Sequence, residues 1–126
     1  MRIDKHDIPV VMAVPGATAR QVAAGPELAA EYFSLATGTD IAPLLHGLDG
    51  DACQVPHWGY VISGTLVVTF TDGYAGEERC NGGDCFYWPG GHSVRVEDDA
   101  EVILFSPHVA HAAVIDHMKA VLQTMA

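Results

Sequence analysis

His92 lies on a segment whose alternation separates a polar face from an apolar face. Side chains two residues apart on a β-strand point to the same face of the sheet. Arg95 and Glu97 alternate with Val94 and Val96, so the valine face is expected to point inward. His92 has the parity of the valines. The alternation therefore predicts an imidazole in the interior of a β-structure.

A second strand pattern directs another imidazole and a thiol inward. His57 shares its parity with Val61, which is expected to be buried. Extending the same alternation backward across Pro56 adds Cys53 and Asp51 to this face. Two imidazoles, a thiol and a carboxylate are therefore expected to meet in one interior.

These side chains are typical metal ligands. Imidazole and thiolate suit zinc and iron, and a carboxylate extends the choice to manganese. One divalent ion on Cys53, His57 and His92 would keep positions open for water or substrate. Asp51 is expected as a further ligand or as a partner that orients an imidazole. The alternative is that the histidines form hydrogen bonds within the core and the cysteine packs as a small hydrophobe.

The composition limits the class of protein. The chain has 126 residues, 49% of them hydrophobic, and a formal net charge of -10. We expect one domain, residues 1–126, because this length and apolar content can close a single core and do not suit a disordered or fibrous chain. Six Lys and Arg against sixteen Asp and Glu exclude a track for nucleic acid. No apolar run approaches the roughly 20 residues that span a bilayer, so no membrane partner is expected.

The cysteines and the N-terminal segment predict a reducing compartment. Three cysteines, Cys53, Cys80 and Cys85, form an odd set without a Cys-x-x-Cys pair. Residues 1–7 alternate charges where a secretory signal would carry an apolar stretch. The expected location is the cytoplasm.

The periodicity divides the chain into three parts. Residues 1–50 are irregular, and their apolar pieces, such as 8–14 and 32–35, are interpreted as edge strands and loops. From residue 51 to 106, short β-type runs alternate with turn signals, which predicts an antiparallel sandwich or barrel. The predicted strands are 58–63, 65–71, 85–88, 94–97 and 101–106, separated at Gly64, Asp72-Gly73, 81–83, 89–91 and Asp98-Asp99.

A helix is predicted over residues of about 107–125. Ser106 is a suitable N-cap, and Pro107 suits the first helical position. Apolar residues then recur at three- and four-residue intervals, so one face is expected to pack on the barrel or on a second subunit. The three histidines of this segment are expected to face solvent: His108, His111 and His117.

The segment from residue 51 to 106 resembles the cupin superfamily. Residues 51–64, DACQVPHWGYVISG, resemble the first cupin motif, which carries two histidines, a glutamate and a glycine. Residues 83–92, GDCFYWPGGH, resemble the second, which carries a glycine, a Pro-x-Gly and a histidine. The glycine and proline framework matches well, and it covers about half of the chain.

The ligand positions depart from the cupin pattern. Asp51 and Cys53 fall where the two histidines are expected, and His57 falls where the glutamate is expected. Val94 occupies the position of the last histidine, and His92 lies two residues earlier on the same face. The usual ligand set of three histidines and a glutamate is therefore absent, and a rearranged site and a metal-free barrel both stay open.

The resemblance implies an all-β fold. This is the double-stranded β-helix of cupins, a jelly-roll-like antiparallel β-barrel, here with a C-terminal α-helix. It also implies a pocket for a small molecule, expected to be lined by Tyr60, Phe86, Trp88 and Val94. A homodimer is expected from the resemblance, and because strand edges and an apolar helical stripe need covering.

Two functions follow from these observations. The first is a protein with one divalent metal, zinc, iron or manganese, that binds or acts on a small molecule, as cupin oxygenases, isomerases and lyases do. The second is a metal-free, non-catalytic binding or sensor module. In the second, His57 and His92 are hydrogen-bonding groups only.

Overall fold

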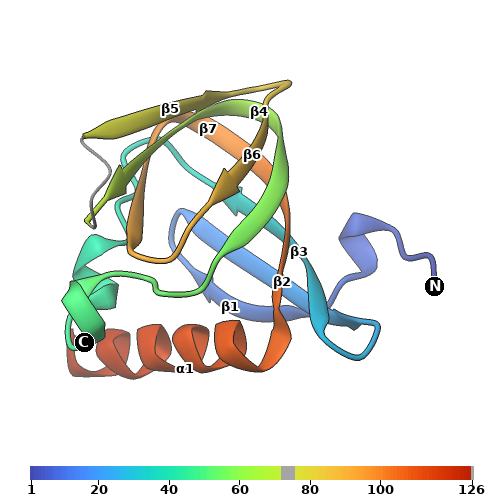
Figure 1. Ribbon diagram of the computed structural model, residues 1–126, viewed down its shortest axis with the longest axis horizontal. Helices are drawn as coiled ribbons and strands as arrows, with labels where there is room; N and C mark the ends of the chain where they lie inside the picture. The colour runs from blue at the N-terminus through green and yellow to red at the C-terminus, as the bar shows by residue number, and fades with distance from the viewer. Residues whose placement is uncertain (72–75, 126) are drawn as a thin grey trace.

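Antiparallel strands curl into a barrel, and one long helix closes its lower side (Figure 1). This computed structural model describes residues 1–71 and 76–125. Within them the strands are β1 (Val10–Val14), β2 (Ala17–Ala24), β3 (Leu28–Leu35), β4 (His57–Phe70), β5 (Glu77–Asn81), β6 (Cys85–Trp88) and β7 (His92–Pro107). The helices are α1 (His108–Met125) and three short 3-10 turns, η1 (Lys5–Asp7), η2 (Ala42–Leu45) and η3 (Asp49–Asp51).

Two long strands form the main axis of the barrel. β4 and β7 pair antiparallel over most of their length, with Trp58 opposite Phe105 and Phe70 opposite His92. Each was expected as two shorter strands, and the structure corrects this because Gly64 and Asp98-Asp99 lie within continuous strands. The register shifts near Gly64, whose φ is 86°, so this glycine allows a bulge and bend. The turn predicted at Asp72-Gly73 lies outside the described residues.

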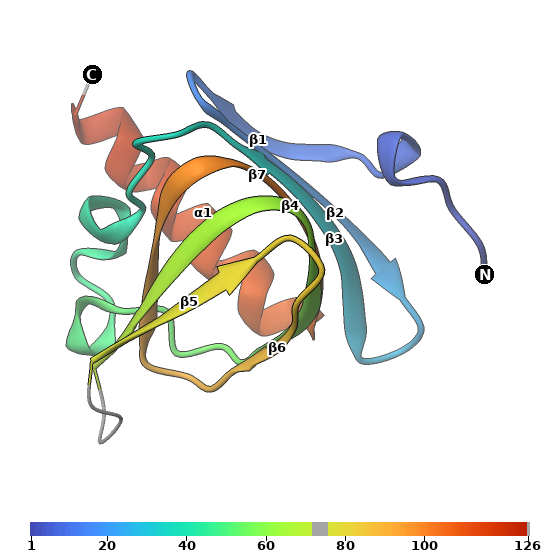
Figure 2. The ribbon, with the colours of Figure 1, turned by 90° about the horizontal axis from the view of Figure 1, so that it is seen from above.

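The first three strands form one wall of the barrel (Figure 2). The sheet order is β1-β2-β3-β7-β4-β5, and β6 pairs with β4. The edge position expected for the apolar piece 8–14 is correct, because β1 ends the sheet. The edge position expected for 32–35 is wrong, because β3 lies between β2 and β7 and pairs with both.

Helix α1 lies under the barrel and contributes to the core. Val114, Ile115 and Met118 pack in one cluster with Met12 of β1 and Leu45 of η2. A second cluster fills the barrel between β4, β6 and β7. The barrel of the same chain therefore covers the first part of the helical stripe expected from the sequence, whereas Met125 at its end is 63% exposed. No helix in the described part of the chain has both the length and the apolarity that crossing a membrane requires.

Gly64 allows a testable comparison with Gly83. Both have a positive φ, 86° and 96°, so alanine at either position incurs a backbone cost of about 1–2 kcal/mol. A Cβ on Gly64 would lie 2.0 Å from the carbonyl oxygen of Asp99, whereas a Cβ on Gly83 meets no atom within 4 Å. We expect Gly64→Ala to lower the free energy of unfolding in urea clearly more than Gly83→Ala. Equal losses would show that the approach of β4 to β7 is not tight.

Candidate metal centre

Three potential ligand atoms meet inside the barrel. Cys53, His57 and His92 are buried, and their ligand atoms all lie within 4.8 Å of one another. His57 begins β4 and His92 begins β7. An isolated bridge holds Cys53 beside His92, with the Cys53 N–H donating to the His92 carbonyl oxygen at 2.8 Å. The structure thus brings together the three residues selected from strand parity.

The spacing of these atoms suits a tetrahedral ion. Cys53 Sγ lies 3.6 Å from His57 Nε2. An ion with a metal–sulfur distance of about 2.3 Å and a metal–nitrogen distance of about 2.0–2.1 Å separates two such ligands by about 3.6 Å. The rings of His57 and His92 have their centroids 5.0 Å apart. The two atoms of the Cys53–His57 pair therefore need little movement to share one ion.

Each imidazole uses its Nδ1 within the protein. His92 Nδ1 lies 2.8 Å from the Pro89 carbonyl oxygen, which can only accept, so this nitrogen carries the proton. His57 Nδ1 lies 2.6 Å from Ser106 Oγ. The Ser106 hydroxyl donates to Glu31, so its oxygen accepts from His57. In both rings the Nε2 lone pair is then left for a ligand bond, which is the usual arrangement of histidines that bind metals.

A buried carboxylate organises the groups behind His57. Glu31 of β3 is 0% exposed, and it accepts hydrogen bonds from Ser106 Oγ, His111 Nδ1 and Gln21 Nε2, the last at 2.8 Å. These three donors come from β7, α1 and β2. We call Gln21, Glu31, Ser106 and His111 the Glu31 network. It links the helix to the candidate centre, because Ser106 also contacts His57.

Burial sets the protonation of the three candidate ligands. Loss of hydration lowers the pKa of His57 well below its ordinary value, and the neighbouring rings of His111 and His92 lower it further. Burial also lowers the pKa of His92, against the opposing effect of the Pro89 hydrogen bond. The pKa of Cys53 is raised to about 11, mainly by burial. At neutral pH the imidazoles are uncharged, and the thiol keeps its proton until an ion displaces it.

Asp51 does not lie with this cluster, which corrects the expectation that it faces the interior. Its side chain is exposed and accepts from the Gly47 N–H at 3.0 Å. Residues 49–51 form a 3-10 turn, and Asp51 has a φ of 53°. The strand alternation used for the prediction therefore stops at Cys53.

A cavity of about 100 Å³ lies next to the candidate ligands. Four residues were expected to line such a pocket. Trp88 and Val94 line it as expected. Phe86 does not line it and instead stacks on Trp88, with ring centroids 3.9 Å apart. Tyr60 is 43% exposed on the outer face, since it has the opposite parity to Val61. The expectations for Phe86 and Tyr60 are therefore corrected.

Sequence reasoning missed the Glu31 network. His111 was expected in solvent but is 4% exposed, and Ser106 was expected to cap the helix but lies in β7 with its hydroxyl bonded to Glu31 and His57. One signal was available, because His111 lies four and seven residues before Ile115 and Met118 on the buried stripe. Another was the single carboxylate of Glu31 within the apolar strand β3.

Comparison with known proteins supports the fold. No protein-family model and no curated protein sequence matches the chain. Among solved structures, a variant of Bacillus subtilis oxalate decarboxylase aligns with a TM-score of 0.61 and 24% identity, over 84% of this chain. A Streptococcus pyogenes protein of unknown function aligns at TM-score 0.55 and 18% identity, over 72% of this chain and 73% of that one. Both proteins have cupin folds.

The chain has the cupin fold. The Clostridium difficile EutQ protein is a further similar cupin, with a TM-score of 0.53 and 19% identity, over 73% of this chain and 62% of that one. The chain spans only 29% of the length of the oxalate decarboxylase chain. At these identities the comparisons support the cupin barrel predicted from the glycine and proline framework, and they leave the activity of this chain to be argued from its own residues.

The buried imidazoles predict a pH dependence of stability. His57 and His92 have lower pKa values when folded than the ordinary 6.5, so the unfolded chain takes up protons first as pH falls. Their contribution to the free energy of unfolding is therefore complete above pH 6.5 and is lost below it. The free energy of unfolding then falls by up to about 1.4 kcal/mol per pH unit for each histidine. We expect His92→Gln to reduce the slope of unfolding free energy between pH 6.5 and 5. The exposed His46→Gln variant is the control, and an equal slope in wild type and His92→Gln would contradict the prediction.

Ser106 offers a test of the imidazole tautomer. Ser106→Ala removes the acceptor of His57 Nδ1–H and one donor to Glu31. We expect the His57 ring to shift toward the Nε2–H tautomer, as read from its ¹⁵N chemical shifts, with a stability loss of about 1–3 kcal/mol from unsatisfied buried groups. Ser34→Ala, a matched change on β3, should alter neither quantity. An unchanged His57 tautomer in Ser106→Ala would remove Ser106 from this role.

Proposed function

We propose that this cupin barrel binds one divalent metal ion through Cys53, His57 and His92, and that it binds a small molecule in the adjoining cavity. The observation that carries the proposal is the buried meeting of one sulfur and two nitrogen ligands, with a sulfur–nitrogen distance of 3.6 Å that suits a shared ion. Both Nδ1 atoms are engaged elsewhere. The two imidazoles are thereby oriented for binding through Nε2.

The donor set favours zinc or iron over manganese. A thiolate and two imidazoles are softer than the oxygen ligands that manganese prefers. The manganese expectation depended on a carboxylate from Asp51, and that side chain lies at the surface. A divalent ion on three protein ligands would supply a Lewis acid with an open coordination position. The protein itself would orient His57 through Ser106 and Glu31. It would also enclose the open coordination position of the ion beside the cavity.

A thiol nucleophile is the alternative enzymatic use of the same residues. Cys53, His57, Ser106 and Glu31 follow one another in the order of a nucleophile, a base and orienting groups. Burial raises the pKa of Cys53 to about 11, however, and its neighbour His57 is uncharged at neutral pH. Reactive cysteines have lowered pKa values in electropositive surroundings. The cluster therefore favours a metal ligand over a nucleophile.

A metal-free binding module is the second candidate function. Hydrogen bonds to the Pro89 carbonyl and to Ser106 satisfy one nitrogen of each ring without any ion. The cavity beside them has apolar walls, as expected of a site for a small molecule. In this case ligand binding would stabilise the chain equally with and without a chelator.

Metal analysis tests the proposal directly. We expect one zinc or iron ion per chain in protein that is purified without chelator, or after titration of the chelated protein. Cys53→Ser, His57→Ala and His92→Ala should lose stoichiometric binding, and His46→Ala should retain it. Because Cys53 must release its proton, zinc affinity should rise about tenfold per pH unit between pH 7 and 9.

Cobalt provides an independent reading of the same site. Co²⁺ bound to a thiolate gives a charge-transfer band in the near ultraviolet, which Cys53→Ser should abolish. Ser106→Ala should keep the band while weakening affinity by roughly 10–100-fold, the usual effect of removing the partner of a ligating histidine. Unchanged metal stoichiometry in both histidine variants would exclude this centre and favour the metal-free function.

A further inference from the structure

We infer that the cavity selects a small uncharged molecule, with an apolar body and one polar end, and excludes carboxylates. This inference rests on the proposed function, because the cavity and the three candidate ligands form one site. Cys53, His57 and His92 all line the cavity. A molecule bound there would therefore touch the imidazoles and the thiol, or an ion held by them.

The volume limits the size of the occupant. The cavity has about 100 Å³. An engineered protein cavity of about 150 Å³ accepts benzene, so this one suits a molecule of roughly four or five non-hydrogen atoms. Half-buried Val14, Thr18 and Thr39 line part of it, together with exposed Asp40, and they mark its entrance. The buried part is lined mainly by apolar side chains.

The polar groups of the buried part of the cavity are gathered in one place. The rings of His57 and His92 have centroids 5.0 Å apart, and those of His57 and His111 are 4.4 Å apart. Leu66, Leu104 and other fully or nearly fully buried apolar side chains form the rest of the inner wall. Within this buried part, an occupant can hydrogen-bond or coordinate at one end only. Its remaining atoms meet apolar walls.

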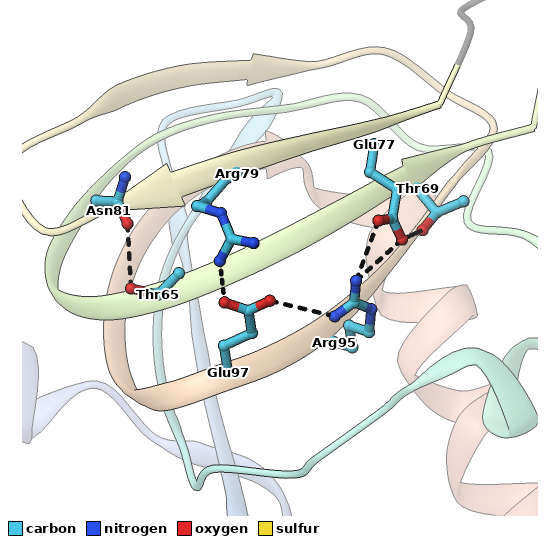
Figure 3. A network of polar contacts seen from close by, with 7 residues as sticks. All are labelled: Thr65, Thr69, Glu77, Arg79, Asn81, Arg95 and Glu97. Carbon is cyan, nitrogen blue, oxygen red and sulfur yellow. Dashed lines mark hydrogen bonds and ion pairs between the residues drawn. The ribbon is translucent and has the colours of Figure 1, made fainter.

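The cavity offers no cation to an anionic ligand. Within residues 1–71 and 76–125, no lysine or arginine lines it, and Asp40 adds a carboxylate at the entrance. Figure 3 shows that Arg79 and Arg95 are already engaged on the outer face of the sheet. Arg79 pairs with Glu97, and Arg95 bonds to Glu77 at 3.1 Å and lies 3.5 Å from Glu97. A carboxylate entering the cavity would lose its hydration without a charged partner.

Negative groups surround a divalent ion bound at this site. Cys53 would bind it as a thiolate and offset one of its two positive charges. The carboxyl group of Glu31 lies behind His57 through Ser106, and Asp40 lies at the entrance. These groups reduce the attraction of the loaded site for an anion. The likeness in fold to oxalate decarboxylase is therefore not expected to extend to a dicarboxylate ligand.

Propanamide and propanoate test the inference, because they have the same number of non-hydrogen atoms and differ in charge. Each is titrated into protein with ¹³C-labelled methyl groups, metal-loaded and chelator-treated, and the shifts of the Val94, Val96 and Leu104 methyls are followed. We expect propanamide to saturate these shifts and propanoate to bind at least about tenfold more weakly in both forms. Oxalate should produce no saturable shift. Equal or tighter binding of either anion, or no binding of propanamide, would overturn the inference.

Two matched variants show whether the probe occupies this cavity. Ala19 lines the cavity from β2 and is buried, whereas Ala23 of the same strand is exposed. Ala19→Leu fills the space and should abolish propanamide binding, while Ala23→Leu should leave it unchanged. If Ala19→Leu fails to fold, Val94→Ile makes a smaller intrusion and should weaken binding. Retained affinity in the folded cavity variant would place the probe elsewhere and contradict the inference.

Failure of this inference can be separated from failure of the proposed metal site. Metal content is measured on the same samples before titration and after oxalate addition. Stoichiometric metal together with tight anion binding would overturn the ligand class alone. Absent metal together with selective propanamide binding would overturn the metal centre alone and support the metal-free module.

Discussion

The placement of one buried carboxylate constrains much of this molecule. Glu31 is fully enclosed, and a carboxyl group in an apolar interior is tolerated only with hydrogen-bond partners around it. Its donors come from Gln21 on β2, Ser106 on β7 and His111 on α1. The barrel wall and the helix must therefore dock together in one arrangement. Ser106 also accepts a hydrogen bond from His57 Nδ1–H. The hydrogen bonds of Glu31 that fix the helix therefore also orient the His57 ring toward Cys53.

The candidate centre combines this orientation with a different source of rigidity. His57 and His92 each begin a long strand, and the backbone bridge from Cys53 to His92 fixes the third residue beside them. Burial keeps the imidazoles uncharged and the thiol protonated. An ion would thus enter a preformed set of neutral donors and displace a single proton. Because the apolar cavity adjoins these three residues, a small molecule as well as water can reach the ion.

Parity predicted that Cys53, His57 and His92 would meet. His57 and His92 begin regular strands, in which alternation fixes the face of each side chain, and a backbone bridge to His92 holds Cys53 ahead of β4. The alternation does not extend to Asp51, which has a positive φ and lies in a 3-10 turn. Local signals were also insufficient at Ser106 and His111. A serine before a proline suits a helix cap, and a helical histidine suits solvent, until a buried carboxylate from a distant strand attracts both side chains. Periodicity indicates which residues are buried, and it does not identify their partners across the core.

The long β4–β7 ladder has a consequence for how the protein reaches this state. It pairs residues that are far apart in the chain, such as Trp58 with Phe105, and chains dominated by such non-local contacts fold slowly. The three candidate ligands meet away from the main run of this ladder, because His57 pairs with Trp88 of β6 and an isolated bridge joins Cys53 to His92. These pairings also join residues that are far apart in the chain, so the three side chains come together only as the barrel forms. A metal ion bound there would tie these segments to one another and slow the unfolding of the barrel.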